Sequence, residues 1–145
     1  MKPMEFFLHA SCRALLLTDK IMTQEENLKQ LLFKDLCARL PYGVICSSVF
    51  GNSKVTSIDT EDNTIYLFDY SEWAYNVKPY LRPMSSMTEE EKKEWHYLYL
   101  PLPHKNETSE TERRIDWLNA HHFDYRGLIE KGLALEAKEG MYKIE

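Results

Sequence analysis

Apolar residues recur at three- and four-residue intervals in the segment that follows Met22, which is the spacing of one face of an α-helix. The segment opens with Thr23 and, three residues later, Glu26, a pair that has the form of a capping box. Pro41 and Gly43 end the pattern. The sequence therefore predicts an amphipathic helix of about 16 residues. Its apolar stripe consists of Leu28, Leu31, Leu32, Leu36 and Leu40.

The next segment, from Val44 to Tyr70, is rich in β-branched and aromatic residues and contains two turn-like stretches, GNSK and EDNT. We expect three consecutive strands, at about 43–50, 54–60 and 64–70. The third, TIYLFDY, has apolar side chains on both faces, so both faces need a cover or the sheet must curl. This pattern predicts a small antiparallel meander that remains open or curls into an SH3-like partial barrel.

The stretch after the third strand contains Pro79 and Pro83, which remove backbone donors and disfavour a helix. We expect an extended connection here, followed by a short acidic helix. A capping box of Thr88 and Glu91 marks the start of that helix. The polar, proline-containing run at 101–112 predicts an exposed loop.

A helix is predicted again from Glu112, and Asp124 is expected to cap a second, short helix by accepting from amides two and three residues further on. Gly132 would end that helix, and LALEA, residues 133–137, is a candidate closing strand. The fold class is therefore α+β, with an N-terminal helix, a small antiparallel meander and a C-terminal helical pair. Residues 23–145 are expected to form one domain, and residues 1–22 an N-terminal extension, with Met22 an alternative start.

Composition limits the classes of function. The chain has 145 residues, a formal net charge of −5 and a pI near 5.6, which disfavours generic binding to nucleic-acid phosphates. Cys12, Cys37 and Cys46 form neither a disulfide framework nor a zinc knuckle, so reduced thiols and a cytoplasmic location are expected. No apolar run approaches the length that a membrane-spanning helix needs, and no cofactor is expected.

Three blocks of sequence, KDLCARLPYGV (34–44), VKPYLRPMSSMTEEE (77–91) and IDWLNAHHFDYRGLIEKGLALEA (115–137), resemble a family of uncharacterised small proteins encoded by gut Bacteroidales genomes and their prophages. The resemblance spans most of residues 23–143. It implies a phage or mobile-element setting and a cytosolic protein. It implies no activity and no site residues.

Aromatic residues crowd the stretch after the third strand, where they alternate with prolines and cations. Such rings either cover a face of the sheet or present a recognition surface for a protein segment. We therefore expect a non-enzymatic protein-binding module with a protein partner. The candidate binding residues are Trp73, Tyr75, Lys78, Tyr80, Arg82 and Trp95.

Two alternative functions compete with this hypothesis. His121, His122 and Asp124 carry the atoms of a divalent metal site, as a metal-dependent hydrolase would need, but adjacent residues of a helix point about 100° apart. Arg113, Arg114 and Arg126 are candidates for a positive face that binds single-stranded nucleic acid. No catalytic residue is assigned from the sequence.

Overall fold

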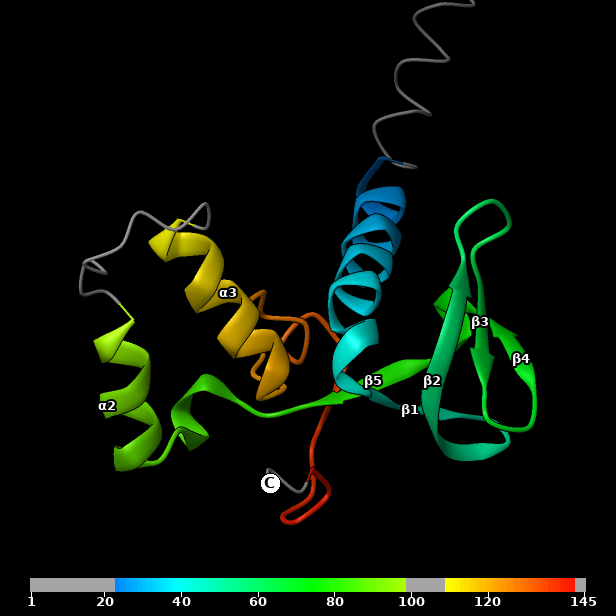
Figure 1. Ribbon diagram of the computed structural model, residues 1–145. Coiled ribbons are helices and arrows are strands. Elements are labelled where there is room, and N and C mark those ends of the chain that lie inside the picture. Colours follow the sequence, from blue (N-terminus) through cyan, green and yellow to red (C-terminus); the bar gives the residue numbers. More distant parts are fainter. Residues whose placement is uncertain (1–22, 99–108, 143–145) are drawn as a thin grey trace, which may run out of the picture.

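The computed structural model describes residues 23–98 and 109–142. It has the α+β architecture that the sequence predicts, with one mixed sheet and, among the described residues, three α-helices. In Figure 1 the N-terminal helix stands in the centre, the strands β1 to β4 lie on one side of it, and α2 and α3 lie on the other. The predicted extension 1–22, with the alternative start at Met22, falls outside the described residues, as does most of the predicted loop 101–112.

The N-terminal helix covers residues 23–39 and continues into a 3-10 turn, η1 (Leu40–Tyr42). Gly43 ends it in the left-handed conformation, with φ 72°, and its amide donates to the carbonyl of Leu40. The predicted helix is therefore confirmed, together with its end. Its first eight described residues are exposed, so the buried side chains of the helix all lie in its second half.

In the described part of the chain, the sheet has six strands in the order β4-β3-β2-β1-β5-β6. The strands are β1 (Ile45–Ser48), β2 (Gly51–Asp59), β3 (Thr64–Leu67), β4 (Ser71–Trp73), β5 (Lys78–Leu81) and β6 (Leu135–Glu136). The first three are the strands that the sequence predicts, and they form the predicted antiparallel meander. β6 is the predicted closing strand, and it pairs with β5 in parallel.

The sheet remains open, so the SH3-like partial barrel is not formed. The connection predicted to be extended supplies β5, which lies beside β1 and not beside β3. This placement of β5 puts β4 and β6 at opposite edges of the sheet. A closed barrel would require these two strands to pair.

The helices α2 (Glu89–Tyr97) and α3 (Glu110–Ala120) pack on each other away from the sheet (Figure 1). Thr88 and Glu91 form the predicted capping box. The prediction of a second helix after α3 is wrong, because residues 124–132 form successive turns. Asp124 accepts from the amides of Leu128 and Ile129, four and five residues on, and so closes a loop where we expected a helix cap.

Within residues 23–98 and 109–142, three clusters of buried side chains hold these elements together. The largest joins Leu32 and Leu36 of the N-terminal helix to the inner face of the sheet. A second lies between α2, α3 and Phe123, and a third surrounds Leu81 and Leu128. The N-terminal helix therefore covers one face of the sheet with one of its own faces.

The same helix is also bound to the C-terminal segment, through buried charges that lie beside Leu32 and Leu36. Asp35 and Arg39 are completely buried and form an ion pair of 2.8 Å, one helical turn apart. Arg126 donates to the other oxygen of Asp35 at 2.8 Å, and Arg39 donates to the carbonyl of Phe123 at 2.6 Å. The carboxylate of Asp35 thus binds two guanidinium groups, one from its own helix and one, of Arg126, 91 residues further along the chain.

Replacing Asp35 with alanine leaves Arg39 buried without a counter-charge, so we expect the free energy of unfolding to fall by about 3–5 kcal/mol. Urea unfolding followed by circular dichroism measures this change. The matched control is Asp62→Ala, which removes an exposed carboxylate of the β2–β3 turn and should change stability by less than about 0.5 kcal/mol. A loss of less than about 1 kcal/mol for Asp35→Ala would contradict the structural role of the ion pair.

Candidate functional site

The aromatic residues predicted to bind a partner do not form one surface. Trp73 is exposed at the end of β4 and contacts the ring of Tyr75, with ring centroids 5.9 Å apart. Trp95 instead lies on α2, in the other half of the molecule, where the guanidinium of Arg114 is 3.7 Å from its ring centroid. The structure therefore brings Trp73 and Tyr75 together and separates Trp95 from them (Figure 1).

The remaining predicted binding residues divide between surface and interior. Lys78 is exposed, but Tyr80 is buried and donates its hydroxyl hydrogen to Asn52 at 3.1 Å. Arg82 makes two hydrogen bonds to the carboxylate of Glu91, which lower the pKa of Glu91 to about 2, and it stacks on Phe123. Tyr80 and Arg82 therefore have structural roles. Tyr80 joins β5 to β2, and Arg82 joins the end of β5 to α2.

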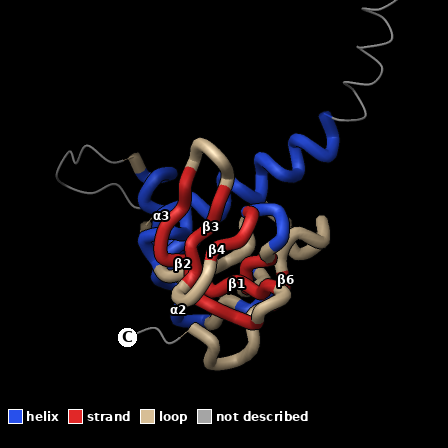
Figure 2. Tube along the Cα trace, turned by 90° about the vertical axis from the view of Figure 1, so that its right-hand side faces the viewer, coloured by secondary structure: helices blue, strands red, loops and turns tan. Residues whose placement is uncertain are grey.

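A different set of large apolar side chains is exposed on β3, on β4 and on the β1–β2 and β3–β4 turns. We call this set the outer aromatic surface, and Figure 2 views the molecule from the side on which these strands lie, with β2 to β4 toward the reader. Its members are 42–84% exposed. They are Val49, Phe50, Tyr66, Phe68 and Trp73.

Strand register and ring contacts place these side chains near one another. Tyr66 lies opposite Ser71 in the β3–β4 pair, and Trp73 lies opposite Thr64, so both rings are on the face turned away from the buried Ile65. Phe50 packs edge-on against Tyr70 at 5.2 Å. The hydroxyl of Tyr70 bonds to Ser48, which ties the β1–β2 turn that carries Val49 and Phe50 to the β3–β4 turn that carries Phe68.

Sequence reasoning identified only Trp73 of this surface. A signal for the others was present, since Val49 and Phe50 immediately precede the predicted turn GNSK, and turns lie at the surface. The third predicted strand also had a second apolar face, which holds Tyr66 and Phe68 and which we expected other rings to cover. Among the described residues that face remains exposed.

The surroundings of the outer aromatic surface are acidic. Residues 49–73 contain five carboxylate side chains and a single lysine. The carboxylates belong to Asp59, Glu61, Asp62, Asp69 and Glu72. This charge favours a partner whose apolar residues are flanked by basic ones, and it repels phosphate backbones.

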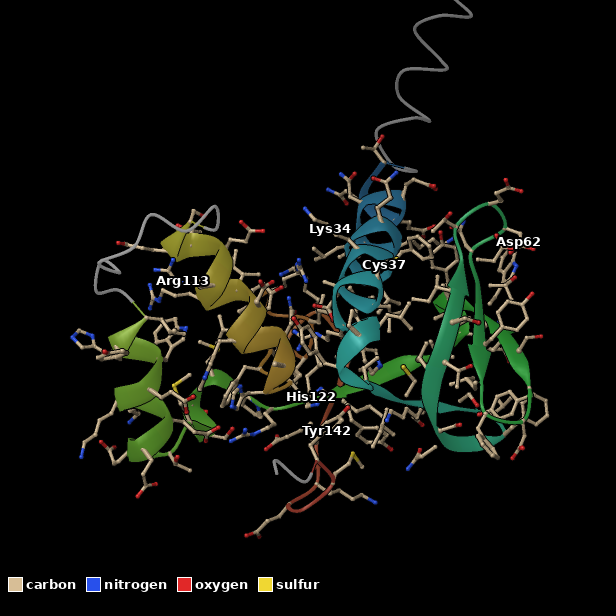
Figure 3. The ribbon with its side chains drawn as sticks, in the orientation of Figure 1. Lys34, Cys37, Asp62, Arg113, His122 and Tyr142 are labelled. Carbon is tan, nitrogen blue, oxygen red and sulfur yellow. The ribbon has the colours of Figure 1, made fainter. Side chains whose placement is uncertain are left out.

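The histidines and the aspartate proposed for a metal site have separate structural contacts. His121 Nδ1 lies 2.8 Å from the carbonyl of Trp117, and both carboxylate oxygens of Asp124 accept from backbone amides. His122 is buried and stacks on Tyr142, with ring centroids 3.6 Å apart (Figure 3). Among residues 23–98 and 109–142, no three His, Cys, Asp or Glu side chains are grouped so that they could hold a metal ion.

His122 has an unusual environment for an ionisable group. Its backbone has φ 62°, a left-handed conformation that residues other than glycine rarely adopt. Burial lowers the pKa of the imidazole to about 4, and the positive charge of Arg39 adds to the effect. His122 is therefore neutral at physiological pH.

The arginines proposed for nucleic-acid binding do not build a common positive face. Arg114 is buried against Trp95, and Arg126 is bound to Asp35. Arg113 lies on α3 and is partly buried (Figure 3). Cys37 and Cys46 are free thiols, and burial raises the pKa of Cys46 to about 12, so it does not act as a nucleophile.

The low pKa of His122 predicts how stability depends on pH. An unfolded chain binds a proton at this histidine near pH 6.5 and the folded chain near pH 4, so unfolding takes up a proton between these values. The contribution of His122 is therefore fully present above pH 6.5 and is lost as the pH falls toward 4. We expect the variant His122→Asn, whose side chain also tolerates a positive φ, to show a smaller loss of stability on acidification.

Urea unfolding at about pH 7 and about pH 5 measures this difference, because Glu91 titrates at lower pH. Loss of the stacking on Tyr142 lowers the stability of the variant at both pH values and does not affect the comparison. Equal pH-dependent losses in the two proteins would contradict the assignment.

No protein-family model, curated protein or solved structure matches the chain. In the part of the chain that the structure describes, no helix has the length and apolar character needed to cross a bilayer. Its function must therefore be inferred from the geometry of its own residues.

Proposed function

We propose that the chain is a non-enzymatic protein-binding module that docks a partner on its outer aromatic surface. The observation that supports this proposal most strongly is the exposure of five large apolar side chains on neighbouring turns and strands at one side of the sheet. Contiguous exposed apolar residues are uncommon on soluble monomers and mark interaction sites when they occur. Aromatic residues are also the side chains that contribute most to the free energy of binding at protein interfaces.

The chemistry of the surface indicates the kind of partner. Phe50, Phe68 and Trp73 provide apolar anchor points, and the carboxylates around them attract positive charge. We infer a protein segment with apolar side chains between lysines or arginines. Among the described residues β4 also lies at the edge of the sheet, where an extended segment could add a strand once the amide of Trp73 is released from the side chain of Glu72.

The resemblance noted above supports a phage or mobile element of gut Bacteroidales as the setting of this module, with a host or phage protein as the partner. Unpaired thiols at Cys37 and Cys46 support a cytoplasmic location. The metal-dependent hydrolase and the single-stranded nucleic-acid binder have less support, because the side chains they require are engaged elsewhere in the fold.

The proposal is tested by affinity capture from host cells, with and without phage infection, using Phe68→Ser and Trp73→Ser. Both side chains are exposed, so the variants should fold normally while binding of the partner weakens at least tenfold, roughly 1.4 kcal/mol or more. The matched control is Tyr97→Ser, which removes a ring of similar exposure, 64%, from α2. Quantitative mass spectrometry compares the captured proteins.

A partner that the wild type and Tyr97→Ser retain, and that both surface variants lose, supports the proposal. Raising the salt concentration should weaken capture, because the attraction between the acidic surface and a basic partner is screened. Identical sets of captured proteins for all four chains would contradict it.

A further inference from the structure

A second potential binding region lies between the end of the N-terminal helix, the beginning of β2, the end of α3 and the C-terminal segment. It is a cleft of about 660 Å³, a volume within the range of small-molecule sites. Its lining includes His122 and Tyr142, which Figure 3 shows close together beneath the N-terminal helix. It shares no residue with the outer aromatic surface.

The electrostatic character of the cleft is positive. None of the residues that line it is acidic, and Lys54 contributes an ammonium group that forms no ion pair within the described residues. The side chain of Lys54 lies against Gly43, where a Cβ would collide with it. Arg39, Arg82 and Lys54 all add positive potential at His122. Of the buried carboxylates, that of Asp35 is already bound to two arginines, and that of Asp124 accepts from two backbone amides.

The imidazole of His122 is the second polar group of the cleft. His122 is only 5% exposed, and no described residue makes a hydrogen bond to either nitrogen of its ring. Nδ1 is sealed from solvent without a partner, and an unpaired buried acceptor costs less than an unpaired buried N–H donor. The proton of the neutral ring therefore belongs on Nε2, which is the nitrogen that can meet a ligand.

The ring is also held in a fixed orientation. It stacks on Tyr142 at an interplanar angle of 12°, and the hydroxyl of Tyr142 is anchored by the amide of Ile45 at 2.9 Å and the carbonyl of Tyr80 at 2.7 Å. The left-handed backbone of His122 is the kind of strained conformation that proteins retain at functional positions. The surroundings of His122 thus fix a neutral N–H donor at the wall of a positive cleft.

We propose that this cleft binds a small oxyanion, a carboxylate or a phosphate, that accepts hydrogen bonds from the ammonium of Lys54 and from Nε2–H of His122. Asn52 lines the same cleft, and because its side-chain oxygen accepts from Tyr80, its NH₂ group is a further donor. Ile45 and Met141 supply apolar walls for the organic part of a carboxylate ligand.

The experiment is a titration of the ¹⁵N-labelled full-length chain, followed by amide chemical shifts, with inorganic phosphate, benzoate and neutral benzamide as probes. We expect phosphate or benzoate to shift the amides of Gly43, Lys54 and His122 saturably, with a dissociation constant at or below about 1 mM. Shifts with phosphate alone identify a phosphate-type ligand, and shifts with benzoate alone identify an organic carboxylate. Benzamide should bind at least about tenfold more weakly than benzoate.

Two variants test the proposed donors, and a third serves as the control. Lys54→Met removes the ammonium, and His122→Phe removes both ring nitrogens while it keeps a ring to stack on Tyr142. Each should weaken binding at least about tenfold, because hydrogen bonds to charged ligands are strong, and the spectra show directly whether the variants fold. Lys93→Met removes an exposed lysine of α2 and should bind as the wild type does.

Three results would overturn the proposal. The first is the absence of saturable shifts at these amides with either anion. The second is benzamide binding as tightly as benzoate. The third is wild-type affinity for the anion in Lys54→Met or His122→Phe, or a loss of affinity in Lys93→Met as large as theirs.

Discussion

The buried carboxylate of Asp35 makes the contacts that fix how the two halves of the molecule are arranged. One half contains β1 to β4, and the other contains α2 and α3. The carboxylate is buried between Arg39 of its own helix and Arg126 of the C-terminal segment, and a buried charge is tolerated only when it is paired. Arg39 then fixes the carbonyl of Phe123. The backbone of Arg82, at the end of β5, in turn bonds to His122 and Asp124 on either side of Phe123. The carboxylate of Asp35 and its two arginines thus align the N-terminal helix, the turn after α3 and the end of β5.

This arrangement determines which surfaces remain for binding. The N-terminal helix covers the inner face of the sheet with Leu32 and Leu36, and the neighbouring Asp35 and Arg39 bind the C-terminal segment. No described element is left to cover the outer face of β3 and β4, so the rings there remain exposed. The same turn that the ion pair fixes also places His122 at the wall of the positive cleft, beside residues of β2. Both proposed sites therefore follow from how the sheet, the turn after α3 and the C-terminal segment pack around the N-terminal helix.

Much of the secondary structure was predictable because it depends on local signals. The spacing of leucines predicted the first helix, β-branched and aromatic residues between turn-like stretches predicted three strands, and Thr88 with Glu91 predicted the start of α2. The helix expected after Asp124 does not form because its carboxylate closes a turn. Local sequence does not distinguish this outcome from a helix cap, since both begin with an aspartate that accepts backbone hydrogen bonds.

The candidate sites were harder to predict because they depend on contacts that are distant in sequence. When both faces of a strand are apolar, alternation alone does not show which face lies inside, so the exposure of Tyr66 and Phe68 was missed. Tyr80 and Arg82 carried the chemistry of a recognition surface, but pairing of β5 with β1 and packing against α2 bury them in structural contacts. The role of His122 depends on Tyr142 and Lys54, which the sequence alone does not bring together.

Native-state hydrogen exchange of the wild-type chain tests the central role of the ion pair most directly. If Asp35 joins the helix to the C-terminal segment as one cooperative unit, the amides of Leu36, Phe123 and Leu128 open with the same free energy, close to that of global unfolding. The account is contradicted if Phe123 and Leu128 exchange through a separate opening of much lower free energy while Leu36 remains protected.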